Sequence, residues 1–304
     1  PQLAEVLENP ACQLPIVPST ITQTVYKEAD DTLIASLNTA TLFNNQHSEK
    51  PHGKFKTKTF STALSDQLFA SAKAQEVSVF SVLLACIQLI TLRFSNQDSV
   101  SIGGVRSLRH PDAQNVYGNF LANELYYCDL DPNTSVTDFI AQCFAQITQQ
   151  LANPLAYDAL LKKVRENYTV EEKLPSVYMT LEPQKRHDVP WVITQNNMLP
   201  SQVKYPLYFE FDMQDTLSLR VEYRTAIYSD TQIQQLITAV EHVLTSFSTQ
   251  LERPVGDIDL MSVEQRTCLL EKYTASVPAY PENDLVSQFV AMAERAPTKC
   301  ALMC

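Results

Sequence analysis

Glycine is scarce in this chain, with five residues among 304. Phosphate-binding loops and dinucleotide fingerprints need several glycines at close, fixed spacing, because the backbone must come near the phosphates. Gly103 and Gly104 are adjacent and Gly118 stands apart, so neither motif can be built. The few glycines instead indicate where the chain must turn or approach another group closely.

Basic residues are also few. The chain has 23 Lys and Arg residues against 34 Asp and Glu residues, for a formal net charge of −11. A general nucleic-acid binder needs a basic surface that displaces counterions from phosphates. We therefore expect no nucleic-acid partner.

Long hydrophobic runs are missing as well. The longest mostly apolar stretch, Val79 to Leu92, is interrupted by Ser81 and Gln88, and a membrane-spanning helix needs about 20 apolar residues. Pro1 to Glu5 contain neither an initiator methionine nor a basic region before an apolar core, so they do not resemble a signal peptide. We expect a buried helix at 79–92, no membrane contact, and a chain cut from a longer protein.

Close pairs of metal-ligating residues are absent from the sequence. The seven cysteines and five histidines are scattered, without zinc-site spacing, a disulfide framework or a helical His-Glu-x-x-His pattern. This predicts no metal site and a reducing, cytoplasmic location. What the chain does have is 45% hydrophobic content with only 19% charged residues, which is typical of a globular protein with a sizeable core.

The fold expected is α/β, with a mixed, mainly antiparallel sheet and helices packed against it. Alternation predicts a strand at Lys54 to Phe60 and a hairpin formed by Pro206 to Asp212 and Thr216 to Arg224. The short run Ser99 to Gly103 predicts a buried strand that the paired glycines break, and Gly118 to Leu130 predicts another strand.

Apolar residues at helical spacing predict the helices. One helix is expected from Ser61 to Ala74, and a second begins after Ser78, whose hydroxyl can cap the exposed amides. A core-facing stripe is expected between Val136 and Leu151. Ser229 and Gln232 have the spacing of a capping box at the start of a further helix.

Several segments resemble the condensation domains of nonribosomal peptide synthetases. Phe80 to Ala85, Arg93 to Asp98 and Ile102-Gly103 are similar in order and spacing to a stretch in which a helix runs into a strand near the active-site tunnel. Arg109 to Asp112, followed by Tyr117 to Leu121, resembles an arginine turn and the motif Gly-x-Phe-Val-Asn-Thr.

The resemblance departs from that motif at its Asn-Thr pair, which falls on Ala122 and Asn123. It then continues along the chain through three segments: Asn153-Pro154-Leu155, Leu219 to Tyr223, and Pro254 to Leu260. After these, Asp284 to Phe289 and Ala296-Pro297 resemble the opening of an adenylation domain.

The resemblance implies four segments in the chain. Residues 1–52 would be the tail of a first lobe with a connecting segment, and 53–262 the C-terminal lobe, with the fold of half of chloramphenicol acetyltransferase. Residues 263–282 would be a linker, and 283–304 the truncated, loosely packed start of an adenylation domain.

The resemblance also implies an activity. A carrier-tethered amine attacks a carrier-tethered acyl or peptidyl thioester and forms an amide. The phosphopantetheine arms of the carriers tether the substrates, and no cofactor is bound directly. The implied partners are donor and acceptor carrier proteins, the missing N-terminal lobe and a downstream adenylation domain. The family's His-His-x-x-x-Asp-Gly motif does not occur in this sequence, so no catalytic residue is expected here.

Four residues are candidates for the substrate tunnel or the interface between lobes: Arg109, Gly118, Phe120 and Asn123. Arg109 could equally pair with Asp112. Gly118 and Phe120 could instead shape a strand and pack the core.

Two other functions stay open. The chain could be a non-catalytic module that docks carrier proteins, or one lobe of another two-lobed acyltransferase that uses coenzyme A or a carrier. The sequence does not reveal which substrates are joined, the stereochemistry of the donor, the final product or the oligomeric state.

Overall fold

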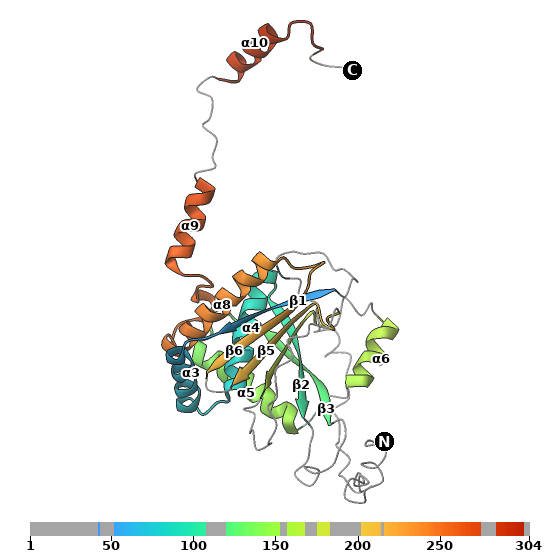
Figure 1. The fold of residues 1–304 in the computed structure, drawn as a ribbon, viewed down its shortest axis with the longest axis vertical. Coiled ribbons are helices and arrows are strands. Elements are labelled where there is room, and N and C mark those ends of the chain that lie inside the picture. The colour runs from blue at the N-terminus through green and yellow to red at the C-terminus, as the bar shows by residue number, and fades with distance from the viewer. Residues whose placement is uncertain are drawn as a thin grey trace, which may run out of the picture. The chain divides into compact units, whose positions relative to one another are not determined.

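The computed structural model describes residues 42, 52–107, 120–152, 157–167, 175–182, 202–213, 216–274 and 284–300. The chain divides into two units, Pro1–Leu260 and Met261–Cys304. The first unit contains a sheet and its helices (Figure 1). Of the expected segments, residues 1–41 and 43–51 fall outside the described part.

The sheet has six strands in the order β1-β6-β5-β4-β2-β3. The strands are β1 (Gly53–Thr59), β2 (Ser99–Ser107), β3 (Leu121–Asp129), β4 (Val177–Glu182), β5 (Leu207–Met213) and β6 (Leu217–Arg224). The pairs β1–β6, β5–β6 and β2–β3 are antiparallel, while β4 runs parallel to both β2 and β5. The expected mixed, mainly antiparallel α/β fold is confirmed.

The helices of the first unit are α3 (Thr62–Ala74), α4 (Val79–Ser95), α5 (Val136–Ala152), α6 (Tyr157–Asn167) and α8 (Asp230–Thr249). As predicted, Ser78 caps α4 by accepting from the Ser81 amide, and Ser229 and Gln232 form a capping box at the start of α8. Each cap supplies a partner to an amide that the first helical turn leaves unpaired.

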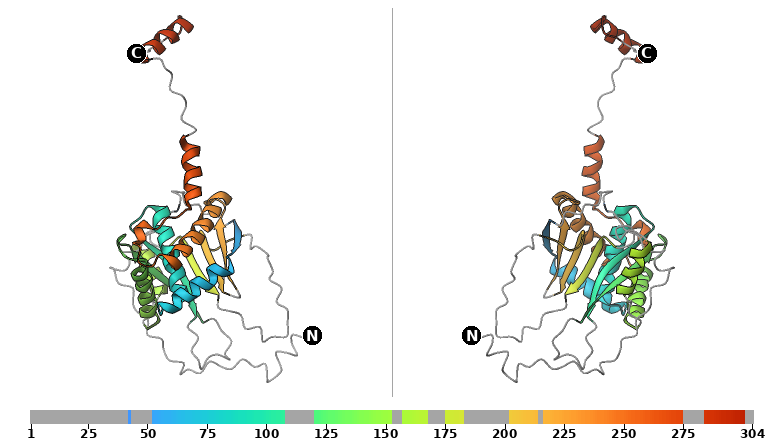
Figure 2. Two further views of the ribbon diagram at one scale, coloured as in Figure 1. Left: turned by 90° about the vertical axis from the view of Figure 1, so that its left-hand side faces the viewer. Right: turned by 90° about the vertical axis from the view of Figure 1, so that its right-hand side faces the viewer.

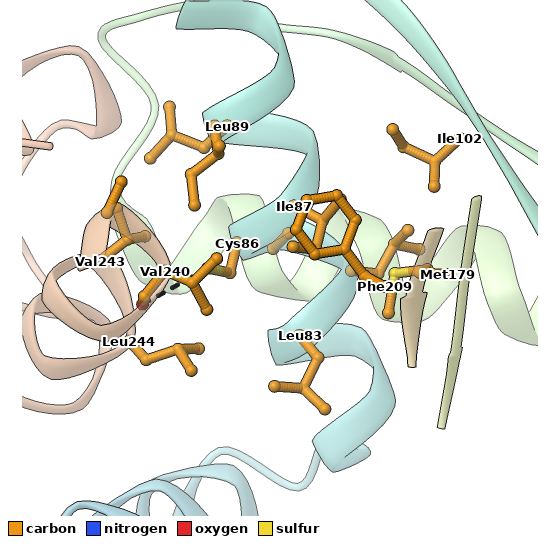
Figure 3. Packing of buried hydrophobic residues seen from close by; sticks show 14 of the residues in the cluster. Leu83, Cys86, Ile87, Leu89, Ile102, Met179, Phe209, Val240, Val243 and Leu244 are labelled. Atoms are coloured by element: carbon orange, nitrogen blue, oxygen red, sulfur yellow. Dashed lines mark hydrogen bonds between the residues drawn. The ribbon is translucent and has the colours of Figure 1, made fainter. Parts of the chain in front are cut away.

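One face of the sheet is covered by α3, α4, α5 and α8 (Figure 1 and Figure 2). Helix α4 is the centre of this layer, and every residue from Ser81 to Thr91 on it is buried. Figure 3 shows α4 between α8 and the strands, with Ile87 beside Phe209 of β5. On the other side of α4, the thiol of Cys86 lies 3.9 Å from the carbonyl oxygen of Val240 in α8.

Gly103 and Gly104 do not break β2, which continues to Ser107. This prediction was wrong because the glycines serve close approach rather than a turn. A Cβ on Gly103 would lie 2.2 Å from the Tyr178 ring, and one on Gly104 would lie 2.6 Å from the Tyr126 ring. Successive residues of a strand point to opposite faces. The glycine pair therefore makes room for one tyrosine on each face of the sheet.

The expected stripe on α5 is confirmed except at its last residue. Val136, Phe139, Ile140 and Cys143 are buried, and Ile147 packs half-buried against the core. Leu151, by contrast, is 57% exposed.

The second unit contains α9 (Val263–Thr274) and α10 (Leu285–Arg295), and neither helix has a buried residue. Asp284 caps α10 by accepting from the Ser287 amide. Helix α10 thus carries exposed apolar side chains, which include Leu285, Phe289 and Met292.

Among the described residues, no single helix is long and apolar enough to cross a membrane. Helices α3 and α4 pass that test of length and composition only when taken together, and they are bent by 108° relative to one another.

Candidate functional site

The two faces of the sheet differ in chemistry. In β5, Leu207, Phe209 and Phe211 are fully buried against the helix layer, while the residues between them are only half-buried. Those residues are Tyr208, Glu210 and Asp212. Strand β6 shows the same alternation. The face opposite the helix layer, here called the second face, is therefore aromatic and charged.

Helix α6 covers one end of the second face. Leu160 and Val164 of α6 are buried, as are Leu125 of β3 and Tyr178 of β4, yet none of these four belongs to the core under the helix layer. The hydroxyls of Tyr157 in α6 and Tyr178 are 3.2 Å apart. A small second core thus lies between α6 and the β3–β2–β4 part of the sheet.

A row of tyrosines leads from α6 toward β5. The ring of Tyr205 stacks on Tyr178 with 3.6 Å between centroids, and its centroid is 5.9 Å from that of Tyr208. The Tyr208 hydroxyl lies 2.6 Å from the Thr180 hydroxyl. Burial raises the pKa of Tyr208 to about 12, while the bond to Thr180 lowers it. Tyr208 therefore keeps its proton at neutral pH and can donate or accept a hydrogen bond.

Charged residues follow on β5 and β6. Arg220 lies 2.6 Å from Glu222, and its guanidinium stands 4.5 Å above the ring of Phe55 in β1. Glu210 is the cross-strand neighbour of Arg220. Burial raises the pKa of Glu210; Arg220 lowers it, and the neighbouring carboxylates raise it again. The middle of the second face is therefore an acidic, half-buried surface with one arginine.

Two of the four predicted site residues, Phe120 and Asn123, lie at the β2–β3 end of the sheet. Phe120 immediately precedes β3 and is half-buried, and Asn123 is the partner of Val105 in the β2–β3 ladder. Asn123 is half-buried on the same strand face as Leu125. Arg109 and Gly118 lie outside the described residues, so the structure describes two of the four candidates.

A buried ion pair that the sequence analysis missed lies beside these residues. Arg106 of β2 donates to Glu124 of β3 over 2.6 Å, and the side chains are 14% and 1% exposed. Glu124 directly follows Asn123 but points to the opposite face of the strand. Only the strand register, which pairs Gly104 with Glu124, shows that the two charges meet.

The described residues contain no group of three or more His, Cys, Asp or Glu side chains that could hold a metal ion. The thiols of Cys86, Cys128 and Cys143 are buried, and burial raises the pKa of each one. These three cysteines are consequently poor nucleophiles. The described surface can therefore act on a bound molecule through hydrogen bonds, charge and shape.

Comparison with known proteins gives a consistent result. A family model described as "Condensation domain" matches residues 30–270. The chain is similar to Bacitracin synthase 1 of Bacillus licheniformis, with 25% identity over 255 residues, 79% of this chain and 5% of that protein. It is also similar to Gramicidin S synthase 2 of Brevibacillus brevis, with 21% identity over 254 residues, 80% of this chain and 6% of that protein.

Solved structures show the same fold. A four-domain nonribosomal peptide synthetase, holo-AB3403 bound to AMP and glycine, matches 88% of this chain and 22% of its own, with a TM-score of 0.71 and 16% identity. The first condensation domain of the calcium-dependent antibiotic synthetase, in complex with a substrate analogue, matches 76% of this chain and 52% of its own. Its TM-score is 0.62 at 12% identity. The chain thus spans a small part of its curated relatives and about half of that isolated domain.

Proposed function

Because the chain belongs to the condensation-domain family, we propose that it forms the C-terminal lobe of such a domain and supplies one wall of an amide-forming centre. The observation that carries the proposal is the family match over residues 30–270, in a chain that covers 52% of a solved condensation domain. The other half of the centre would belong to a first, N-terminal lobe.

The second face supports this assignment. A sheet with one apolar face and one aromatic, charged face is suited to packing on a helix layer and facing a polar partner. Among the described residues, helix α6 covers the β3–β2–β4 end of this face, and the β5–β6 part with Glu210 and Arg220 is half-buried. We assign this β5–β6 part to the contact with the first lobe and to the lining of the tunnel.

The proposed reaction needs no covalent catalysis from this lobe. A thioester is already activated, so the centre must hold two phosphopantetheine arms, orient the amine, and manage a proton and an oxyanion. The arms and the amine can be positioned by uncharged hydroxyls, such as that of Tyr208, and by backbone groups at the β2–β3 end of the sheet. The carrier proteins would dock at the surface, and the second unit would start the adenylation domain.

The test is amide formation between two loaded carrier proteins, measured with this chain alone and with the chain extended at its N-terminus by a first lobe. We expect turnover only in the extended protein. Turnover by this chain alone would contradict the assignment of a half-centre. No turnover by either protein, with carrier binding retained by both, would show a docking module instead.

A further inference from the structure

The chain that connects β4 to β5 must cross one face of the sheet. These strands are parallel neighbours, so the connection has to return along the sheet before β5 begins. Strands β1 and β2 run in the same direction, and α3 and α4 of the helix layer join them. The step from β4 to β5 has the opposite sense along the sheet. Because parallel crossovers are right-handed, steps of opposite sense pass over opposite faces, so this connection belongs on the second face.

The described end of the connection lies on the second face. Gln202 pairs with His52, which precedes β1 at the edge of the sheet. Val203 is buried over the second face of β1, where a Cβ on Gly53 would clash with it. The ring of Tyr205 then stacks on the tyrosine of β4. The chain thus approaches β5 from the β1 edge.

Residues 183–201 lie outside the described part, but the residues on both sides of them are described. They follow Glu182 at the end of β4 and precede Gln202 beside the start of β1. These points are three strand steps apart and at opposite ends of the sheet. With about 4.8 Å per step and about 20 Å along the strands, the direct path is about 25 Å, and a segment of this length extends to about 60 Å. The direct path passes over β5 and β6, the part of the second face that carries Glu210.

Carboxylates gather at the start of that path. Glu182 and Asp212 are partners in the β4–β5 ladder, and Glu210 is next along the same face of β5. Burial raises the pKa of Glu210, Arg220 lowers it, and the neighbouring carboxylates raise it again. Like charges on paired strands repel one another. This end of the second face is therefore suited to a cationic partner.

The connecting segment carries cations at the matching place. Lys185 and Arg186 are the third and fourth residues after Glu182, so their backbones lie within about 14 Å of it. The segment contains a single carboxylate, Asp188. Its charge near β4 is therefore opposite to that of the strands beneath the path.

We propose that residues 183–201 cross the second face over β5 and β6, with Lys185 and Arg186 paired to the carboxylates at its β4–β5 end. The segment is then an internal partner of this face, and a first lobe meets the segment and the strands together. The inference goes beyond the proposed function and does not rest on it, because it concerns the chain alone.

Trypsin tests the proposal, because Lys185 and Arg186 are both cleavage sites. After brief digestion of the full chain, mass spectrometry compares cleavage at these sites with cleavage after the exposed Lys299 in the same sample. The triple variant carries three substitutions: Glu182→Gln, Glu210→Gln and Asp212→Asn. We expect it to raise the relative rate at least about tenfold, the effect of losing two partly buried ion pairs.

The matched control removes three exposed carboxylates elsewhere in the first unit, by Asp66→Asn, Glu252→Gln and Asp257→Asn. Its relative cleavage rate should equal that of the native chain. Urea unfolding shows whether the native chain and both triple variants are folded.

Trp191, the only tryptophan of the chain, lies in the segment and gives a second measurement. Acrylamide should quench its fluorescence more strongly in the carboxylate triple variant than in the native chain. Lys185→Glu with Arg186→Glu should have the same effect. Adding Glu182→Lys and Asp212→Lys to that pair exchanges the charges and should restore the protection of Trp191.

Equal cleavage and equal quenching in the native chain and the carboxylate triple variant would overturn the proposal, as would a charge exchange that restores no protection. Because these measurements use neither a first lobe nor a carrier protein, their outcome is independent of the amide-forming assay.

Discussion

At the scale of single residues, the close approach of two tyrosine rings to β2 explains why two of the few glycines lie in this strand. Gly103 faces Tyr178 and Gly104 faces Tyr126, so a strand without side chains at two positions accommodates a ring on each face. Tyr178 cannot withdraw freely, because it stacks on Tyr205 and bonds to Tyr157. The pair of glycines is thus a packing device inside β2.

Gly103→Ala is predicted to destabilise the protein by about 1–3 kcal/mol, the usual cost of an overpacked core. The added Cβ would lie 2.2 Å from the Tyr178 ring. Urea unfolding measures the loss. In a Tyr178→Ala background the same change should cost much less, because the clash has been removed. Equal costs in the two backgrounds would show that the ring is not the cause.

Glu210 gives a pH-dependent prediction. Its pKa is raised above the ordinary 4.5, mainly by burial, so the folded protein holds this proton more tightly than the unfolded chain does. Stability from this group is present at low pH and is lost as the pH rises through the raised pKa. Relative to Glu210→Gln, the native protein should therefore become less stable as the pH rises from about 4 to about 8.

Urea unfolding over this pH range checks the prediction, with Glu252→Gln as the control, since Glu252 is an exposed carboxyl of the same unit. A stability difference between native protein and Glu210→Gln that stays constant with pH would contradict it.

At the scale of elements, the two edges of the sheet are protected differently. Edge strand β1 carries Lys54, Lys56 and Lys58, and two of these pair with α8: Lys54 with Asp230 and Lys58 with Glu241. Edge strand β3 is covered by α5, whose Gln146 donates to the Tyr127 carbonyl over 2.7 Å and whose Gln150 donates to the Leu125 carbonyl over 2.6 Å. The lysines of β1 and the cover of β3 by α5 both hinder pairing of these edge strands with a strand of another chain.

The double variant Gln146→Ala, Gln150→Ala is expected to lose about 1–3 kcal/mol, since two backbone carbonyls lose a donor. It should also aggregate faster, because the edge of β3 becomes free to pair. Chemical unfolding and light scattering measure the two effects. Gln142 and Gln149 are exposed on the same helix, so their double alanine variant is the control. Equal stability and equal aggregation of the two double variants would contradict the role of Gln146 and Gln150 at the β3 edge.

At the scale of the molecule, the first unit contains the core, and none of the described residues of the second unit is buried. Helices α9 and α10 have no buried residue, and Leu285 is 86% exposed. An exposed apolar surface of this kind is typical of a segment that packs against another protein surface.

A chain ending at Leu260 is therefore predicted to keep its stability within about 0.5 kcal/mol of the full chain, since none of the described residues that follow Leu260 is buried. It should also associate less, because the apolar side chains of α10 are gone. Chemical unfolding and sedimentation are the measurements, and a large loss of stability would show that the second unit supports the first.

The sequence by itself determined the local features. The Ser78 cap, the Ser229 capping box and the alternation of β5 and β6 were all predicted and are present. The family was also apparent from short segments spread along the chain. These features depend on residues close together in sequence, whose periods and spacings are visible without a fold.

Only the tertiary structure decided the rest. In the tertiary structure, β4, a strand that the periodicity did not predict, lies between β2 and β5. Strand β2 also continues beyond Gly103 and Gly104. The tertiary structure also brought Arg106 to Glu124 across the β2–β3 register. Contacts of this kind depend on which strands become neighbours, and that choice is made by long-range packing of the whole core rather than by local periodicity.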